Sequence, residues 1–190
     1  MTSQLPTDLP PEVYPLAWLV GAWRGSGTIG YGPVAPAQIT QEVRFRATAG
    51  PYLAYTARTW LAPAPADQTA PTEAAGRGDG HGIGHGDLWH EEAGFWRVTP
   101  GQAQADPPFE VEFLVSDAAG YQSLYLGEVA GPRLRLATDA VIRTASAPEV
   151  NAATRMYGLV EGDLLWAWDI AGFGRELGSY MAARLAPAPA

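Results

Sequence analysis

Apolar and polar side chains alternate with a period of two along most of this chain, and that alternation limits the folds open to it. Ile39, Val43 and Phe45 fall on one face of an extended segment, while Glu42 and Arg44 fall on the other. Such alternation is typical of a β-strand that buries one face and exposes the other to water. Because it recurs in many short segments, the sequence predicts an all-β protein.

Ten strands are predicted, most of them separated by turn residues. They lie at 23–31, 38–47, 52–61, 87–98, 109–116, 121–129, 133–137, 141–146, 153–160 and 164–170. The connections are short, so neighbouring strands should pair antiparallel, and Glu161-Gly162-Asp163 should join the last two as a hairpin. Antiparallel strands with one apolar face either pack as a sandwich or close into a barrel, and the alternation alone does not choose between them.

Two segments favour helix. Residues 16–19 form a short apolar segment that suits one or two helical turns and ends before Gly21. Near the C-terminus, five residues fall at the spacing i, i+3, i+4, i+7 and i+8, which is one face of a helix. They are Leu177, Tyr180, Met181, Arg184 and Leu185. This predicted helix would turn Tyr180 toward the barrel.

A chain of 190 residues suits a single domain, which is expected to span 15–185. Residues 1–14 are polar and rich in proline and are predicted to be a disordered lead-in, and 186–190 a loose tail. Residues 63–86 are rich in Pro, Ala and Gly and have few large apolar side chains. Such a segment cannot bury enough surface to offset its ordering entropy, so a mobile insertion between two strands is predicted.

Composition and charge exclude several classes of function. The formal net charge of -8 repels phosphate backbones, so nucleic acid is not an expected partner. There is no cysteine, which excludes disulfides, thiolate catalysis and Cys-ligated metal sites. The sequence shows neither a signal peptide nor an apolar run of about 20 residues that could span a membrane. A soluble cytoplasmic protein without a membrane partner is therefore predicted.

A glycine-rich pattern, GxWxGxG, stands at the start of the first predicted strand and consists of Gly21, Trp23, Gly25 and Gly27. Glycines at alternate positions let a backbone or a ligand approach one strand face closely. Trp23 lies on the same face and would plug the end of a barrel or form part of a cavity wall. No Lys-Ser/Thr follows the glycines, so a phosphate-binding loop is excluded.

Further segments follow this pattern in a fixed order. PLAWLVGAWRGSG contains the glycine motif, and EVRF, LAYT and HEEAGF come after it. This order resembles the nitrobindin family, and the resemblance runs from about residue 15 to residue 185 apart from the 63–86 insertion. It implies a ten-stranded antiparallel up-and-down β-barrel similar in shape to fatty-acid-binding proteins. It also implies ferric haem b in an apolar cavity, binding of nitric oxide and isomerisation of peroxynitrite to nitrate.

The chain departs from the family pattern at two positions that would face the haem. The resemblance implies an axial histidine in the C-terminal segment, but residues 172–185 contain none, and an ungapped match puts Tyr180 at that position. The family commonly has Tyr-Pro-Thr after the glycine motif, where this chain has Tyr31-Gly32-Pro33. No cofactor is therefore expected. Haem b held through Tyr180 stays open as an alternative, because ferric haem accepts tyrosine in some proteins.

Other polar residues are assigned structural roles. The glycines around His81 and His85 prevent a stable helix that would bring the histidines together, so no metal site is predicted. His90 is expected to make a structural hydrogen bond at the barrel rim. Glu91 and Glu92 are adjacent on a strand, so they point to opposite faces and cannot be a general acid–base pair. No catalytic residue is predicted.

Three functions fit these observations. In the favoured one, the barrel binds a small apolar or planar ligand, with room left by Ala47, Ala54, Gly127 and Gly158. In the second, ferric haem is bound through Tyr180 or water, and the protein binds nitric oxide or isomerises peroxynitrite. In the third, the barrel is degenerate, filled by its aromatic side chains, and acts through its surface. A homodimer is compatible with all three.

Overall fold

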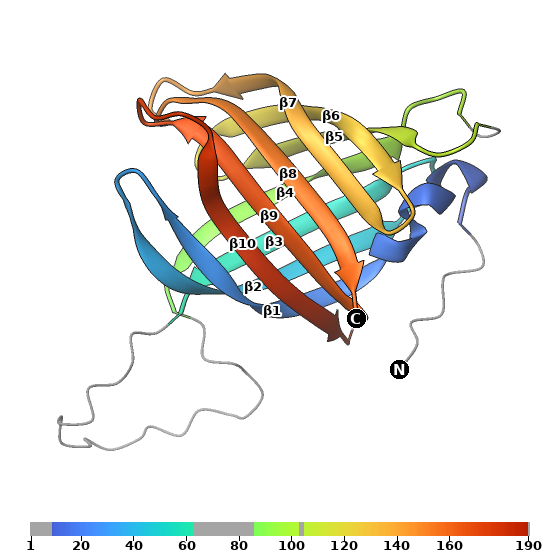
Figure 1. Cartoon of the computed structure of the whole chain (residues 1–190), viewed down its shortest axis with the longest axis horizontal. Coiled ribbons are helices and arrows are strands. Elements are labelled where there is room, and N and C mark those ends of the chain that lie inside the picture. The colour runs from blue at the N-terminus through green and yellow to red at the C-terminus, as the bar shows by residue number, and fades with distance from the viewer. Residues whose placement is uncertain (1–8, 63–85, 103–104, 190) are drawn as a thin grey trace, which may run out of the picture.

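The computed structural model of the protein describes residues 9–62, 86–102 and 105–189. Ten antiparallel strands close into one barrel, in which each strand pairs with its neighbours along the chain and β1 pairs with β10 (Figure 1). The strands are β1 (Gly21–Tyr31), β2 (Val34–Ala47), β3 (Leu53–Leu61), β4 (Leu88–Val98), β5 (Phe109–Asp117), β6 (Tyr121–Ala130), β7 (Arg133–Arg143), β8 (Val150–Val160), β9 (Asp163–Gly172) and β10 (Gly178–Ala188). The predicted all-β barrel is confirmed. Residues 1–8 of the predicted lead-in and all but Gly86 of the predicted insertion lie outside the described residues.

Alternate side chains point into the barrel, as the period-two pattern predicts. Ile39, Val43 and Phe45 of β2 are buried, and the pairing with β3 puts Leu53 and Tyr55 on the same inner side. The Phe45 and Tyr55 rings lie 5.1 Å apart, centroid to centroid. The barrel interior is therefore largely filled by its own side chains.

A 3-10 helix, η1 (Pro11–Leu19), covers one end of the barrel. Figure 1 shows it at the opposite end from the β1–β2 hairpin. Val13, Leu16 and Leu19 are buried, and the Trp23 indole Nε1 donates a hydrogen bond of 2.8 Å to the Leu19 carbonyl. The helix begins at Pro11, within the segment 1–14 that the sequence predicts to be a disordered lead-in. No helix among the described residues is long and apolar enough to cross a membrane.

The glycines of the GxWxGxG motif bring β1 close to β10. A Cβ atom on Gly25 would overlap the backbone of Arg184, and one on Gly27 would overlap the backbone of Ala182 and Ala183. These two glycines therefore accommodate a neighbouring backbone rather than a ligand. Trp23, on the same face, is buried next to the end of η1 and also lines a groove described below.

The prediction of a C-terminal helix is wrong. Residues 178–188 form β10, which closes the barrel between β1 and β9. Met181, Ala183 and Leu185 alternate inward with a period of two, and this requirement of the barrel overrides the helical spacing. The strand also includes 186–188, which the sequence assigned to a loose tail.

Two further sequence predictions differ from the structure. Residues 133–137 and 141–143, from two segments predicted as separate strands, belong to one strand, β7, whose register shifts around Asp139. Residues 144–146, predicted as the end of the second segment, lie beyond β7. Ala54 and Gly158 were expected to leave room inside, but both lie on the outer face, next to the buried Tyr55 and Tyr157.

Candidate functional site

A small cavity lies at the end of the barrel opposite η1. It encloses about 80 Å³ and is lined by the first residues of β4, β6, β8 and β10 and by the last residues of β5, β7 and β9. Its walls are mainly apolar and aromatic. The lining residues are His90, Glu92, Val115, Asp117, Ala119, Tyr121, Ser123, Tyr125, Val141, Val150, Ala153, Arg155, Trp168, Ile170, Phe173 and Tyr180.

A buried ion pair lines the inner part of the cavity. Arg155 of β8 donates two hydrogen bonds to Glu92 of β4, of 2.8 Å from Nη1 and 2.7 Å from Nη2. Both side chains are almost fully buried. The Glu92 carboxylate also accepts a hydrogen bond of 2.6 Å from the Tyr55 hydroxyl, and His90 Nε2 lies 3.4 Å from it. The carboxylate thus has several partners, which is what a buried charge requires.

Burial and the ion pair together set the protonation states at the cavity. Burial by itself would raise the pKa of Glu92, but the charge and hydrogen bonds of Arg155 hold that pKa well below its usual range. Burial raises the pKa of Tyr157 to about 12, against the lowering effect of Arg155. Burial likewise raises the pKa of Asp117, at the outer part of the cavity. Arg155 and Glu92 are therefore charged near neutral pH, while Tyr157 is neutral.

Aromatic rings surround the Arg155 guanidinium. Its Cζ atom lies 4.2 Å from the centroid of the Trp168 ring and 5.1 Å from that of Tyr125, with Phe113 and Trp166 within 6 Å. Cations are attracted to the faces of such rings, more strongly when water is excluded. The rings and Glu92 together hold the guanidinium in one position at the inner side of the cavity.

Tyr180 stands at a β-bulge. Ser179 pairs with Asp169 and Met181 pairs with Trp168, so Tyr180 is an extra residue without a partner on β9. The bulge puts Tyr180 on the cavity wall, with its ring perpendicular to that of Trp168 at 5.0 Å between centroids. Its hydroxyl accepts a hydrogen bond of 3.1 Å from the Trp89 indole. Burial raises the pKa of Tyr180, so the phenol is neutral near neutral pH.

The structure brings three of the residues considered in the sequence, His90, Glu92 and Tyr180, into this one cavity. His90 is buried beside Glu92 and packs against Trp168 at 5.4 Å between ring centroids, so it lies inside rather than at the rim. His81 and His85 lie outside the described residues. Gly21, Trp23, Gly25 and Gly27 are not among the residues that line the cavity.

The prediction that Glu91 and Glu92 face opposite sides is confirmed. Glu92 points inward, and Glu91 forms an exposed ion pair of 2.7 Å with Arg58. Tyr31 lies at the β1–β2 turn, where its hydroxyl donates a hydrogen bond of 2.6 Å to the Glu176 carbonyl. Sequence reasoning missed Arg155. The available signal was its position between the apolar residues Ala153 and Tyr157 of a predicted strand.

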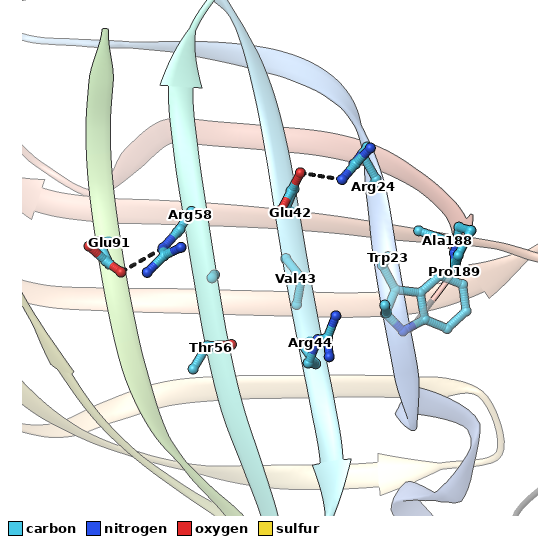
Figure 2. Close-up of a pocket in the computed structure, with 12 residues that line it drawn as sticks. Trp23, Arg24, Glu42, Val43, Arg44, Thr56, Arg58, Glu91, Ala188 and Pro189 are labelled. Atoms are coloured by element: carbon cyan, nitrogen blue, oxygen red, sulfur yellow. Dashed lines mark hydrogen bonds and ion pairs between the residues drawn. The ribbon is translucent and has the colours of Figure 1, made fainter. Parts of the chain in front are cut away.

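A larger groove of about 310 Å³ lies on the outer face of β1 to β4 (Figure 2). Arg24 pairs with Glu42 at 2.5 Å, and Arg58 pairs with Glu91. All four of these side chains are more than a third exposed. Such exposed ion pairs contribute little, and the two charges of each pair offset each other. The polar groups of these pairs are exposed to water, whereas those of the inner cavity are buried. Among the described residues, no group of three or more His, Cys, Asp or Glu side chains is placed to hold a metal ion.

The fold and the cavity together define a class of proteins, the closed ten-stranded β-barrels with an internal cavity at one end. The family described as "THAP4-like, heme-binding beta-barrel domain" matches residues 12–186, and the chain belongs to this family.

Individual relatives cover nearly the whole chain. It is 43% identical to a ferric nitrobindin-like protein of Beutenbergia cavernae, with 98% of this chain and 99% of that protein covered. It is 37% identical to a peroxynitrite isomerase of Leifsonia xyli subsp. xyli, with 97% and 98% covered. The crystal structure of Rv2717c from M. tuberculosis is similar with a TM-score of 0.73 and 26% identity, covering 96% of this chain and 100% of that one. The resemblance to nitrobindins is thus confirmed.

Proposed function

We propose that this barrel binds a small ligand in the cavity next to Arg155, Trp168 and Tyr180, and that ferric haem held by an axial histidine is not part of its function. The proposal rests on the small volume of the cavity inside the barrel. Arg155, Glu92 and the surrounding rings occupy space inside the barrel, and the cavity beside them has a volume of about 80 Å³. Pockets that enclose drug-sized ligands have about 300–1,000 Å³.

The residues present do not fit haem. Haem iron in proteins is held by His, Cys, Met or Tyr side chains. Tyr180, at the position matched to the axial histidine, already accepts a hydrogen bond from Trp89, and its raised pKa opposes the phenolate that a ferric ligand requires. His90, the single histidine among the described residues, is buried against Glu92 and Trp168. Neither residue is therefore placed to act as a ligand of haem iron.

A hemin titration tests the haem half of the proposal. We expect the absorption spectrum of the protein with hemin to match that of hemin with a non-binding control protein. A sharp Soret band that saturates at one equivalent would contradict the proposal. If Tyr180→Phe also abolished that band, the protein would be a tyrosine-ligated haem protein, and a peroxynitrite isomerase assay would follow.

Xenon tests the ligand half, because it enters small apolar cavities without needing a hydrogen bond. We expect the ¹²⁹Xe chemical shift to change saturably with protein concentration. Ser123→Leu adds a larger side chain to the cavity wall and should abolish the change. Gln122→Leu, at the adjacent exposed position, is the matched control and should leave it intact. Equal xenon responses from these two variants would favour the degenerate barrel that acts through its surface.

A further inference from the structure

Two buried hydrogen-bond donors at the cavity have no partner among the described residues. They are the Arg155 Nε–H and the Trp168 Nε1–H, and both residues line the cavity. Buried donors are nearly always paired in folded proteins, because an unpaired one is unfavourable. Two unpartnered donors at one cavity therefore indicate that a ligand of this cavity supplies their acceptor.

The acceptors nearby are already in use. Glu92 accepts two hydrogen bonds from Arg155 and one from Tyr55. The Tyr125 hydroxyl interacts with the side chains of both Arg155 and Trp168, but it brings a donor of its own, so it does not reduce the excess. Donors thus outnumber acceptors at the inner side of the cavity.

The charges around the cavity oppose an anion. Glu92 neutralises Arg155, so the guanidinium does not offer a free positive charge. Asp117 adds a carboxyl group at the outer part of the cavity. Burial raises the pKa of Tyr125 and of Tyr180, which indicates surroundings that disfavour added negative charge at both ends of the cavity.

We propose that the ligand of this cavity is a small neutral molecule, or the neutral head of a larger one, that carries a hydrogen-bond acceptor such as a carbonyl oxygen. The acceptor lies at Arg155 and Trp168, and the apolar remainder packs against Val115, Val141 and Ile170. The inference rests on the proposed small-ligand function and names the chemistry of that ligand. A cavity of about 80 Å³ has room for a group of a few heavy atoms, since one water occupies about 30 Å³ in the liquid.

Three probes of the same size and skeleton test the inference: acetone, acetate and isopropylammonium. Each has four heavy atoms, but the first is a neutral acceptor, the second an anion and the third a cation with donors only. Binding is followed at the indole N–H signal of Trp168 in ¹H–¹⁵N spectra, which is assigned by its loss in Trp168→Phe. We expect acetone to shift this signal saturably, with a Kd on the order of millimolar. Acetate should bind roughly tenfold more weakly or not at all, because it buries a charge. Isopropylammonium should not bind.

Variants separate the hydrogen bond from the packing of the ring. Trp168→Phe keeps an aromatic ring and removes the donor, so acetone affinity, followed at the backbone amide of Ser123, should fall about three- to tenfold. Trp96→Phe is the matched control, because the Trp96 Nε1–H is also unpartnered but Trp96 does not line the cavity. That variant should keep the wild-type affinity.

The outcomes that overturn the inference are distinct from those that overturn the proposed function. Acetate binding as tightly as acetone, or xenon binding without acetone binding, would overturn the inference and leave the small-ligand function standing. If neither xenon nor acetone binds, both are overturned.

Discussion

Arg155 and Glu92 put a full ion pair into a barrel whose other buried side chains are mostly apolar or aromatic. Removing two charges from water is unfavourable, and their attraction offsets this only when the geometry is good and the remaining polar groups have partners. Here the carboxylate has such partners, whereas the Arg155 Nε–H does not. The pair itself therefore adds little to the stability of the fold. Removing one member alone is unfavourable, because it leaves the charge of the other buried without a partner.

Breaking the pair should be costly, and removing both members should be less so. Arg155→Met leaves the Glu92 carboxylate buried without its cation, so we expect the free energy of unfolding to fall by about 3–5 kcal/mol. Adding Glu92→Gln removes the charge but keeps an acceptor for the Tyr55 hydroxyl, so the double variant should be more stable than Arg155→Met alone. Urea denaturation measures the free energy of unfolding of the wild-type protein and of these variants.

The exposed pair Arg58–Glu91 is the matched control, because Glu91 is the residue before Glu92 on β4. The same substitutions there, Arg58→Met and Glu91→Gln, should each change the free energy of unfolding by about 0–1 kcal/mol. If the variants of the two ion pairs lost similar amounts of unfolding free energy, burial would not explain the contribution of the Arg155–Glu92 pair to stability.

At the scale of elements, nine of the ten strands could be predicted from the alternation, β7 as two pieces, but β10 and the phase of β8 could not. In β8 the sequence analysis places Gly158 on the inner face, yet Arg155 and Tyr157 point inward. Because side chains alternate, a phase error of one residue exchanges the two faces of a strand. This error placed Gly158 on the inner face and Arg155 on the outer face. Arg155, the main cationic residue of the site, was therefore not predicted to line the cavity.

Bulges account for the other differences. The extra residue Asp139 changes the phase within β7, so one long strand looks like two short ones in the sequence. The extra residue Tyr180 puts two consecutive residues, Tyr180 and Met181, on the inner side, and this spacing imitates a helical stripe. A bulge is fixed by the pairing of distant strands, so periodicity along one segment does not reveal it. The match to the family pattern, rather than the periodicity, singled out Tyr180, which lines the cavity.

The close contact between β1 and β10 leads to a prediction about the glycine motif. Gly27→Ala would force a methyl group into the backbone of β10, and because backbone cannot move aside, we expect a loss of about 3 kcal/mol or more in the free energy of unfolding. Gly158→Ala is the matched control. A Cβ atom there meets only the Pro132 carbonyl oxygen at 3.7 Å, so this variant should be neutral or stabilised by about 0.5 kcal/mol. Thermal denaturation followed by circular dichroism compares the two, and equal stability of both variants would contradict the assignment of Gly27 to close packing.

At the scale of the whole molecule, the interior combines buried tyrosines with a chain that contains no lysine. Burial raises the pKa of Tyr55 and of Tyr125, and that of Tyr157 to about 12. All twelve cationic side chains are arginines, which keep their charge above pH 12. Between pH 10 and 12, the tyrosines are therefore the main side chains whose ionisation differs between the folded and unfolded protein.

This composition predicts a steep loss of stability at alkaline pH. Below pH 10 the tyrosines are neutral in both states, so their contribution to stability is fully present. Above pH 10 they ionise in the unfolded chain but stay neutral in the folded barrel, and stability falls as the pH rises toward the folded pKa values. Each tyrosine contributes about 1.4 kcal/mol per pH unit, so the three buried ones together give a slope of up to about 4 kcal/mol per pH unit.

Urea denaturation between pH 9 and pH 12 measures that slope. Tyr125→Phe should reduce it by about a third, whereas Tyr14→Phe, at an exposed side chain, should leave it unchanged. A free energy of unfolding that stays constant up to pH 11.5 would mean that these tyrosines reach water in the folded state, and hence that the barrel interior is more open than the packing around Arg155 implies.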